Sequence, residues 1–249
     1  MESIKRTVKL QIKDTKKSII AFWVIMLTVN IAFYLMNFYG RTNINIGMST
    51  GENGLVFLSV VGSNLMAITI FLVVYSYVMY YETFPIVIGF SVTRKDFFSS
   101  VVIDNLLVTF LFALIQGILL KIDPLVVRAI GREPLFDFSF FNIQTDNIIF
   151  IIFSLFIGNI VFVSAVNVLA ALNYKIGFKL WIIFGAIASL LMFTRSGNII
   201  GNTILDFAWK ALNTRVDLFH FLKLGLIVLI CNILGYFITI NINIKDKWT

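Results

Sequence analysis

Six apolar runs of about twenty residues each restrict this chain of 249 residues to few kinds of fold. A helix needs about 20 mostly apolar residues to cross a hydrocarbon core that is ~30 Å thick. The runs lie at about 18–38, 55–80, 98–120, 147–172, 176–194 and 218–241. Charged residues make up 13% of the chain, against about 25% in soluble domains. We therefore predict an all-α membrane protein with six transmembrane helices in a single domain, residues 18–249.

The first 17 residues have a basic amphipathic pattern. Ile4, Val8 and Ile12 share one side of a helical wheel with Met1, and six Lys and Arg residues gather on the opposite side. Such a helix lies in the headgroup region with its cations toward anionic lipid. We expect an interfacial helix at 1–17, with a solvated basic tail as the alternative.

The distribution of Lys and Arg predicts the orientation of the chain. These residues are densest before residue 18, at 94–95, at 175–179 and at 245–247, all of which face inward if the N-terminus is inside. Cytoplasmic segments carry an excess of Lys and Arg. We predict a multi-pass protein of the cell membrane with both termini cytoplasmic. The apolar pattern of residues 195–217 predicts a short extracellular helical element before the sixth span.

Several polar residues fall inside the predicted spans, where contact with lipid would be costly. They are Asn64, Asp104, Asn105, Gln116, Asn159, Asn167 and Asn232. We expect them to face the interior of the helix bundle. They could line a translocation path, or they could join helices through hydrogen bonds, which is the simpler interpretation of any single one.

Several kinds of catalytic or binding site find no support in the residues. The chain has no phosphate-binding P-loop motif, and His220 has no second metal ligand at a suitable spacing. Ser63 and Ser154 lack the surroundings of a nucleophile. No soluble stretch is long enough for a basic nucleic-acid-binding face. We expect no enzyme activity, no metal and no cofactor in this chain, and no nucleic-acid partner.

The stretch 81–100 is the one short, charged segment between two adjacent spans. Pro85 lacks an amide donor and Gly89 permits positive φ, so a continuous helix is not expected here. We predict a short helix on the membrane surface, joined by bends to the spans on either side. Glu82 and the Arg94-Lys95-Asp96 cluster offer ion-pair and hydrogen-bond groups to a partner. A loop that only enforces topology is the alternative.

The run GFSVTRKDFF, residues 89–98, resembles the G-x-S/T-R-K-x-F-F signature of small type-2 ABC-transporter permeases of Gram-positive bacteria. The layout of nearly the whole chain is also similar to that family, in particular to exporters of phenol-soluble-modulin type and of antimicrobial peptides. The resemblance implies that two permease chains pair, and that the segment after span two docks as a coupling helix on a separate ATPase subunit, which holds ATP and Mg²⁺. The coupling role would fall on Glu82, Phe84, Pro85, Gly89, Arg94, Lys95, Asp96, Phe97 and Phe98.

On this basis we expect the permease subunit of an ATP-driven exporter of amphipathic, cytolytic or antimicrobial peptides or similar hydrophobic cargo, in contact with membrane lipid. Two other classes stay open. A membrane scaffold or sensor would use the same inner segment to bind a signalling partner. A secondary transporter would place ionisable residues at mid-membrane, for which Asp104 is a candidate.

Overall fold

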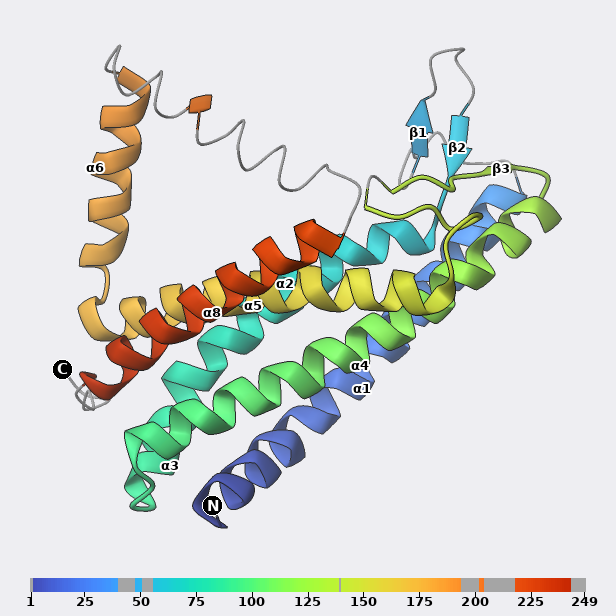
Figure 1. Cartoon of the computed structure of the whole chain (residues 1–249). Helices are drawn as coiled ribbons and strands as arrows, with labels where there is room; N and C mark the ends of the chain where they lie inside the picture. Colours follow the sequence, from blue (N-terminus) through green and yellow to red (C-terminus); the bar gives the residue numbers. More distant parts are fainter. Residues whose placement is uncertain are drawn as a thin grey trace.

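The computed structural model describes residues 2–39, 48–50, 56–138, 140–193, 202–203 and 218–242. This part of the chain is mostly helical (Figure 1). The helices are α1 (Glu2–Phe38), α2 (Asn64–Val78), α3 (Phe84–Gly89), α4 (Arg94–Ala129), α5 (Ile148–Ile176), α6 (Lys179–Phe193) and α8 (Leu218–Ile240). A 3-10 turn, η1 (Val61–Ser63), precedes α2, and a π-helical turn, η2 (Met79–Thr83), joins α2 to α3.

Within the described residues, five helical segments are long and apolar enough to cross a membrane. They are Glu2–Phe38, Val61–Gly89, Arg94–Ala129, Ile148–Ile176 and His220–Ile240. The remaining expected span, 176–194, corresponds to α6, which has 15 residues. At 1.5 Å per residue these described residues extend over about 22 Å. The predicted helical element at 195–217 lies outside the described residues, apart from 202–203.

The expected division between an interfacial helix at 1–17 and a first span at 18–38 is not visible as a break. α1 is one continuous helix of 37 residues. Four of its five buried residues are polar, namely Thr7, Gln11, Asn30 and Asn37, and the fifth is Trp23. Apolar residues of α1 that are partly buried, among them Leu10, Ile19, Phe22 and Met26, also pack against the core. The more apolar side, with Ile12, is exposed.

The prediction of a short helix joined by bends to both neighbouring spans holds on one side only. The chain turns between α3 and α4, whereas α2, η2 and α3 follow one another without a break, as a segment that extends to Gly89. Pro85 lies in the first turn of α3, where a missing amide is tolerated. The π-helical turn directly before it is closed by a bond from the Phe84 amide to the Met79 carbonyl, five residues back. The helix therefore continues past the proline.

α4 lies at the centre of the bundle, where it contacts α1, α5 and α8. α1 and α4 run in the same direction, because Trp23 packs on Phe112 with ring centroids 5.3 Å apart and Tyr34 bonds to Asp123 further along both helices. Trp23 is accordingly a core residue and not an interfacial one. At Gly117 of α4, an added Cβ would lie 2.6 Å from the side chain of Ile152 in α5.

One end of the bundle, called here the turn end, holds the beginning of α1, the turn between α3 and α4, and the last turns of α5 and α8 (Figure 1). The opposite end, called here the sheet end, holds three short strands that the sequence did not predict. They are β1 (Met48–Thr50), β2 (Val56–Leu58) and β3 (Glu133–Pro134). β1 pairs antiparallel with β2, and β2 pairs parallel with β3.

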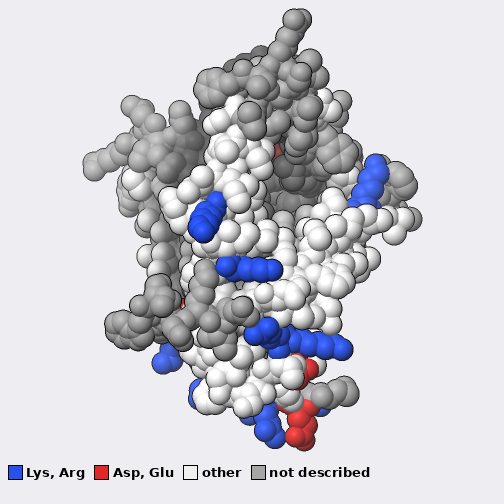
Figure 2. Space-filling view, turned by 90° about the vertical axis from the view of Figure 1, so that its left-hand side faces the viewer, with Lys and Arg blue, Asp and Glu red and all other residues white. Residues whose placement is uncertain are grey.

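α4 also extends further than predicted, since it ends at Ala129 and not near residue 120. Pro124, which we expected in a loop, lies inside this helix. α6 stands away from the other helices and exposes apolar residues along most of its length (Figure 1). Figure 2 shows the same side of the molecule, where uncharged side chains cover much of the described face, basic side chains are spread over it, and acidic side chains lie mainly at its lower end.

Candidate functional site

The turn between α3 and α4 is formed by four residues with distinct local roles. Phe90 ends α3, and Ser91 adopts φ 60°, in the left-handed region that is uncommon for residues other than glycine. Thr93 is the N-cap of α4, and its hydroxyl accepts a hydrogen bond from the Asp96 amide at 3.1 Å. Asp96 also places a negative charge in the first turn of α4, where the helix dipole favours it.

The structure divides the nine predicted coupling residues into two groups. Phe84, Phe97 and Phe98 are buried, so they stabilise the bundle and are not available to a partner. The exposed members are Glu82, Gly89 and Lys95, and the partly exposed ones are Pro85, Arg94 and Asp96.

Aromatic packing explains why the phenylalanines are inside. The ring of Phe84 lies edge-on to those of Phe97 and Tyr174, with centroids 5.0 and 5.6 Å away. Phe90 is the aromatic residue that projects from this turn, with 73% of its surface exposed. Sequence reasoning counted Phe90 as part of an apolar side but did not place it among the partner-binding residues.

Arg94 connects the start of α4 to the end of α8. Its Nη1 donates a hydrogen bond to the main-chain carbonyl oxygen of Ile240 at 2.9 Å. The hydroxyls of Tyr80 in η2 and Thr239 in α8 lie 3.3 Å apart. Thus two segments at the turn end are bonded to the same last turn of α8.

Close packing supports these bonds. An added Cβ at Gly235 of α8 would lie 3.1 Å from the ring of Phe98, and Phe98 packs edge-on to Tyr236 with centroids 5.7 Å apart. Because packed interfaces do not deform continuously, a displacement of the α3–α4 turn must move or break its contacts with α8. The turn is therefore mechanically connected to the long apolar helices.

Five of the seven polar residues predicted to face the interior are buried: Asn64, Asp104, Asn105, Gln116 and Asn167. Asn159 and Asn232 are partly buried. Gln116 joins two helices, because its Nε2 donates to the Val61 carbonyl at 2.8 Å and its Oε1 accepts from Asn64 Nδ2 at 3.4 Å. Gln116 and Asn64 therefore join helices through hydrogen bonds, as the simpler interpretation of these residues predicted.

Asp104 has no such partner. Its side chain is fully buried, and neither carboxylate oxygen meets a hydrogen-bond donor among the described residues. The side-chain oxygens of Asn105 and Asn167 are also buried without a donor there. Asn232 Nδ2 donates to the Val228 carbonyl of its own helix at 2.8 Å and to Ser164 Oγ of α5 at 3.5 Å. The interior thus combines satisfied polar links with unsatisfied polar groups.

Sequence reasoning missed a buried cluster around Asp123 because it assigned that residue to a loop. The carboxylate accepts hydrogen bonds from the Tyr34 hydroxyl, from Ser59 Oγ at 2.7 Å and from the Val61 amide at 3.4 Å. It joins α1, the segment before α2, and α4 at the sheet end. The spacing of Asp123 from Gln116, seven residues, could have revealed it, since both lie on one side of a continuing helix.

The comparisons with known proteins add no family. No protein-family model, no curated protein and no solved structure matches the chain. Within the described ranges, no three His, Cys, Asp or Glu side chains lie close enough together to hold a metal ion. What the fold and site define is therefore a mostly helical protein with five helices suited to crossing a membrane and an exposed turn tied to one of them.

Proposed function

We propose that this chain is the membrane-spanning subunit of an ATP-driven exporter, and that the turn end is its cytoplasmic side. The proposal rests on the family resemblance of residues 89–98 and on the density of Lys and Arg near the first residues of α1 and in the turn. α6 would then be the fifth of six spans. A second permease chain would complete the path, and a separate ATPase subunit would hold ATP and Mg²⁺.

One observation supports this function more than any other. The α3–α4 turn exposes Phe90 and Lys95 while Arg94 is bonded to the end of α8. Exposed aromatic residues such as Phe90 are enriched at protein interfaces, and a charge at the rim of an interface influences the choice of partner. A partner that moves this turn would displace α8 and, through the contact of Phe84 with Tyr174, the end of α5.

The cargo that suits this interior is amphipathic or apolar. The buried polar groups are mostly neutral hydroxyls and amides, and the two buried acids of the described part, Asp104 and Asp123, form no ring of fixed charge that would select an ion. Cytolytic or antimicrobial peptides, or similar hydrophobic molecules, match this description. The tentative path residues are those that lie buried without a partner, namely Asp104, Asn105 and Asn167.

Isolation of the tagged chain from its native membrane, with identification of the chains that accompany it, tests the proposal. We expect an ATPase subunit among them. Phe90→Ala combined with Lys95→Glu should remove the ATPase from the preparation. A matched pair at the sheet end, Leu125→Ala with Arg132→Glu, also changes an exposed apolar residue and an exposed cation and should retain it.

A second experiment addresses coupling. Arg94→Glu combined with Lys95→Glu should leave membrane insertion intact and separate ATP hydrolysis from export. Full export of cargo by this double variant would show that the coupling assignment is wrong. If no ATPase accompanies the wild-type chain, the exporter proposal fails, and a scaffold or sensor function becomes the better one.

The buried carboxyl group of Asp104 is the observation that favours a secondary transporter instead. Ionisable residues inside membrane-spanning bundles often belong to ion or proton pathways. Transport that stops when an ionophore removes the ion gradients, but continues when ATP is depleted, would identify that class.

A further inference from the structure

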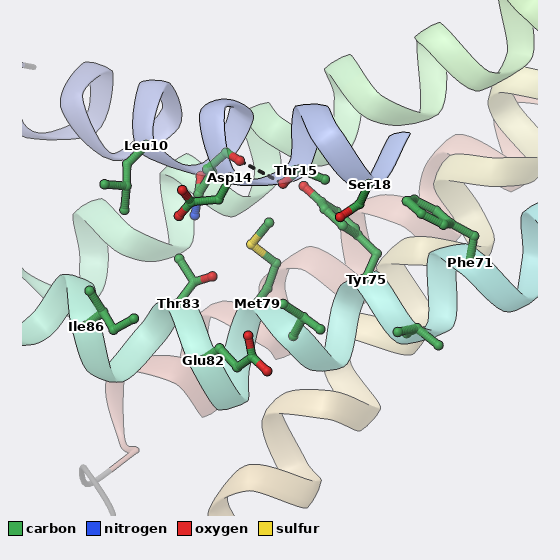
Figure 3. A pocket seen from close by; sticks show the side chains of 13 residues that line it. Leu10, Asp14, Thr15, Ser18, Phe71, Tyr75, Met79, Glu82, Thr83 and Ile86 are labelled. Carbon is green, nitrogen blue, oxygen red and sulfur yellow. Dashed lines mark hydrogen bonds between the residues drawn. The ribbon is translucent and has the colours of Figure 1, made fainter. Parts of the chain in front are cut away.

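A pocket of about 320 Å³ lies between α1 and the continuous segment formed by α2, η2 and α3. It is near the turn end, and Figure 3 shows its lining from both sides. α1 contributes Asp14, Thr15 and Ser18, and the opposite segment contributes Tyr75, Met79 and Glu82. The interior polar residues described above do not line it, so it is a separate site.

Two buried polar side chains line this pocket without hydrogen-bond partners. Gln11 is 1% exposed, and both its Nε2 and its Oε1 lack a partner among the described residues. Tyr75 is 5% exposed, and its hydroxyl is likewise unpaired there. A buried polar group without a partner costs about 1–3 kcal/mol, and folded proteins rarely keep such groups without a use.

Two residues with carboxylates line opposite walls of the same pocket. Asp14 comes from α1 and Glu82 from η2, and both residues are exposed (Figure 3). Neither forms a salt bridge with another residue of the described part of the chain. The lining contains no Lys or Arg. The pocket is therefore acidic although the chain as a whole carries a formal charge of +7.

The rest of the lining is apolar. Leu10, Phe71, Val74, Val78 and Ile86 supply hydrocarbon surface on both sides. A π-helical turn, a feature that often occurs at functional sites, carries Glu82 and Met79 into the lining. An apolar wall, unpaired acceptors and a net negative charge together suit a ligand that has a hydrocarbon part and a cationic end.

We propose that this pocket binds the cationic group of an amphipathic molecule, an ammonium or guanidinium with N–H donors attached to an apolar chain. The carboxylates of Asp14 and Glu82 and the oxygens of Gln11 and Tyr75 accept its hydrogen bonds. The apolar residues contact its chain. Two sources share this chemistry: a basic group of an amphipathic peptide, or the headgroup of an amine-bearing lipid. The inference is independent of ATP-driven export, because it concerns binding by the isolated chain.

The test uses the purified full-length chain in a maltoside detergent, with octylamine as the probe and calorimetric titration as the measurement. Titration of detergent alone gives the heat of partitioning. We expect octylamine to bind more tightly than octyltrimethylammonium, which has the charge without N–H donors, and octanol to bind most weakly.

Asp14→Asn combined with Glu82→Gln should weaken octylamine binding about tenfold, since two charge-assisted hydrogen bonds become neutral ones. Glu2→Gln removes a carboxylate from the same end of α1 but outside this pocket and should leave the affinity unchanged.

Equal binding of octylamine and octanol, or equal affinity in the wild type and the double variant, would overturn the proposal. If the double variant does not fold, the order of affinities of the three probes for the wild-type chain decides the matter alone. Two further arms separate the sources. Binding of an amphipathic lysine peptide, and not of its fully acetylated form, indicates a peptide ligand. Amine-bearing lipids that accompany the wild type but not Glu82→Gln indicate a lipid ligand.

Discussion

Arg94, the first residue of α4, donates a 2.9 Å hydrogen bond to the carbonyl oxygen of Ile240, the last residue of α8. The final carbonyls of a helix have no partner within the helix, and they carry the negative end of its dipole. A guanidinium donates a hydrogen bond to such a carbonyl and also places a positive charge at the negative end of the dipole. The contact joins two residues that are 146 positions apart and fixes the α3–α4 turn against α8.

Arg94→Gln removes this contact and should lower the free energy of unfolding in detergent by about 1 kcal/mol. The expected loss is no larger because the Arg94 side chain is partly exposed. Lys95→Gln is the matched control, since Lys95 is exposed and the same charge is lost from the next residue. We expect no change for that variant. Equal unfolding midpoints for Arg94→Gln and Lys95→Gln would contradict the proposed role of the contact.

Phe97 and Phe90 should respond in opposite ways to truncation. Phe97 is fully buried against Phe84 and Tyr80, so Phe97→Ala should cost about 3–5 kcal/mol of stability. Phe90 is exposed, and Phe90→Ala should leave stability within about 0.5 kcal/mol of the wild type. Thermal unfolding of the two purified variants measures both. A large loss from Phe90→Ala would mean that this ring is packed inside.

Gly117→Ala should destabilise the contact between α4 and α5. The new Cβ would lie 2.6 Å from Cγ1 of Ile152, closer than atoms of two side chains can approach, so the helices must shift. Overpacking of this kind costs about 1–3 kcal/mol. Gly225→Ala in α8 is the control, because nothing lies within 4 Å of its added Cβ. The two unfolding midpoints should therefore differ clearly.

Asp123→Asn should loosen the sheet end. The amide cannot accept all three hydrogen bonds that the carboxylate receives from Tyr34, Ser59 and Val61, and an unpaired buried group costs about 1–3 kcal/mol. Glu133→Gln removes a charge from an exposed residue of β3 and should have little effect. Faster hydrogen exchange at 56–63 in Asp123→Asn alone would locate the change. Unaltered exchange there would rule out the described role of Asp123.

Asp104→Asn should leave stability unchanged or raise it, because a neutral amide is less costly to bury than a carboxylate without a donor. If Asp104 belongs to the translocation path, the same variant should transport cargo more slowly at normal stability. The comparison of unfolding with transport in reconstituted vesicles separates the two effects. A loss of stability would mean that the carboxylate has a structural partner.

The lengths of the apolar runs were sufficient to predict the helical class and most of the helices, because burial in a membrane demands long uncharged segments. The position of polar residues inside these runs also predicted which side chains face inward, since a polar group facing lipid is costly. This is correct for Asn64, Asp104, Asn105, Gln116 and Asn167. Pro85 and Pro124 gave the wrong expectation. Pro85 lies in the first turn of α3, where the helix does not need its amide, and Pro124 lies inside α4.

By itself, the sequence determined that long apolar helices form and which polar residues turn inward, because both follow from the local cost of placing polar groups in an apolar surrounding. The tertiary structure alone decided which residues of the 81–98 segment are available to a partner and which pack inside. Phe84 and Phe97 are hidden by Tyr174 and Tyr80, and Arg94 is bonded to Ile240, through contacts with residues far away in the chain. No local pattern encodes such pairings, since they depend on how the helices are positioned against one another.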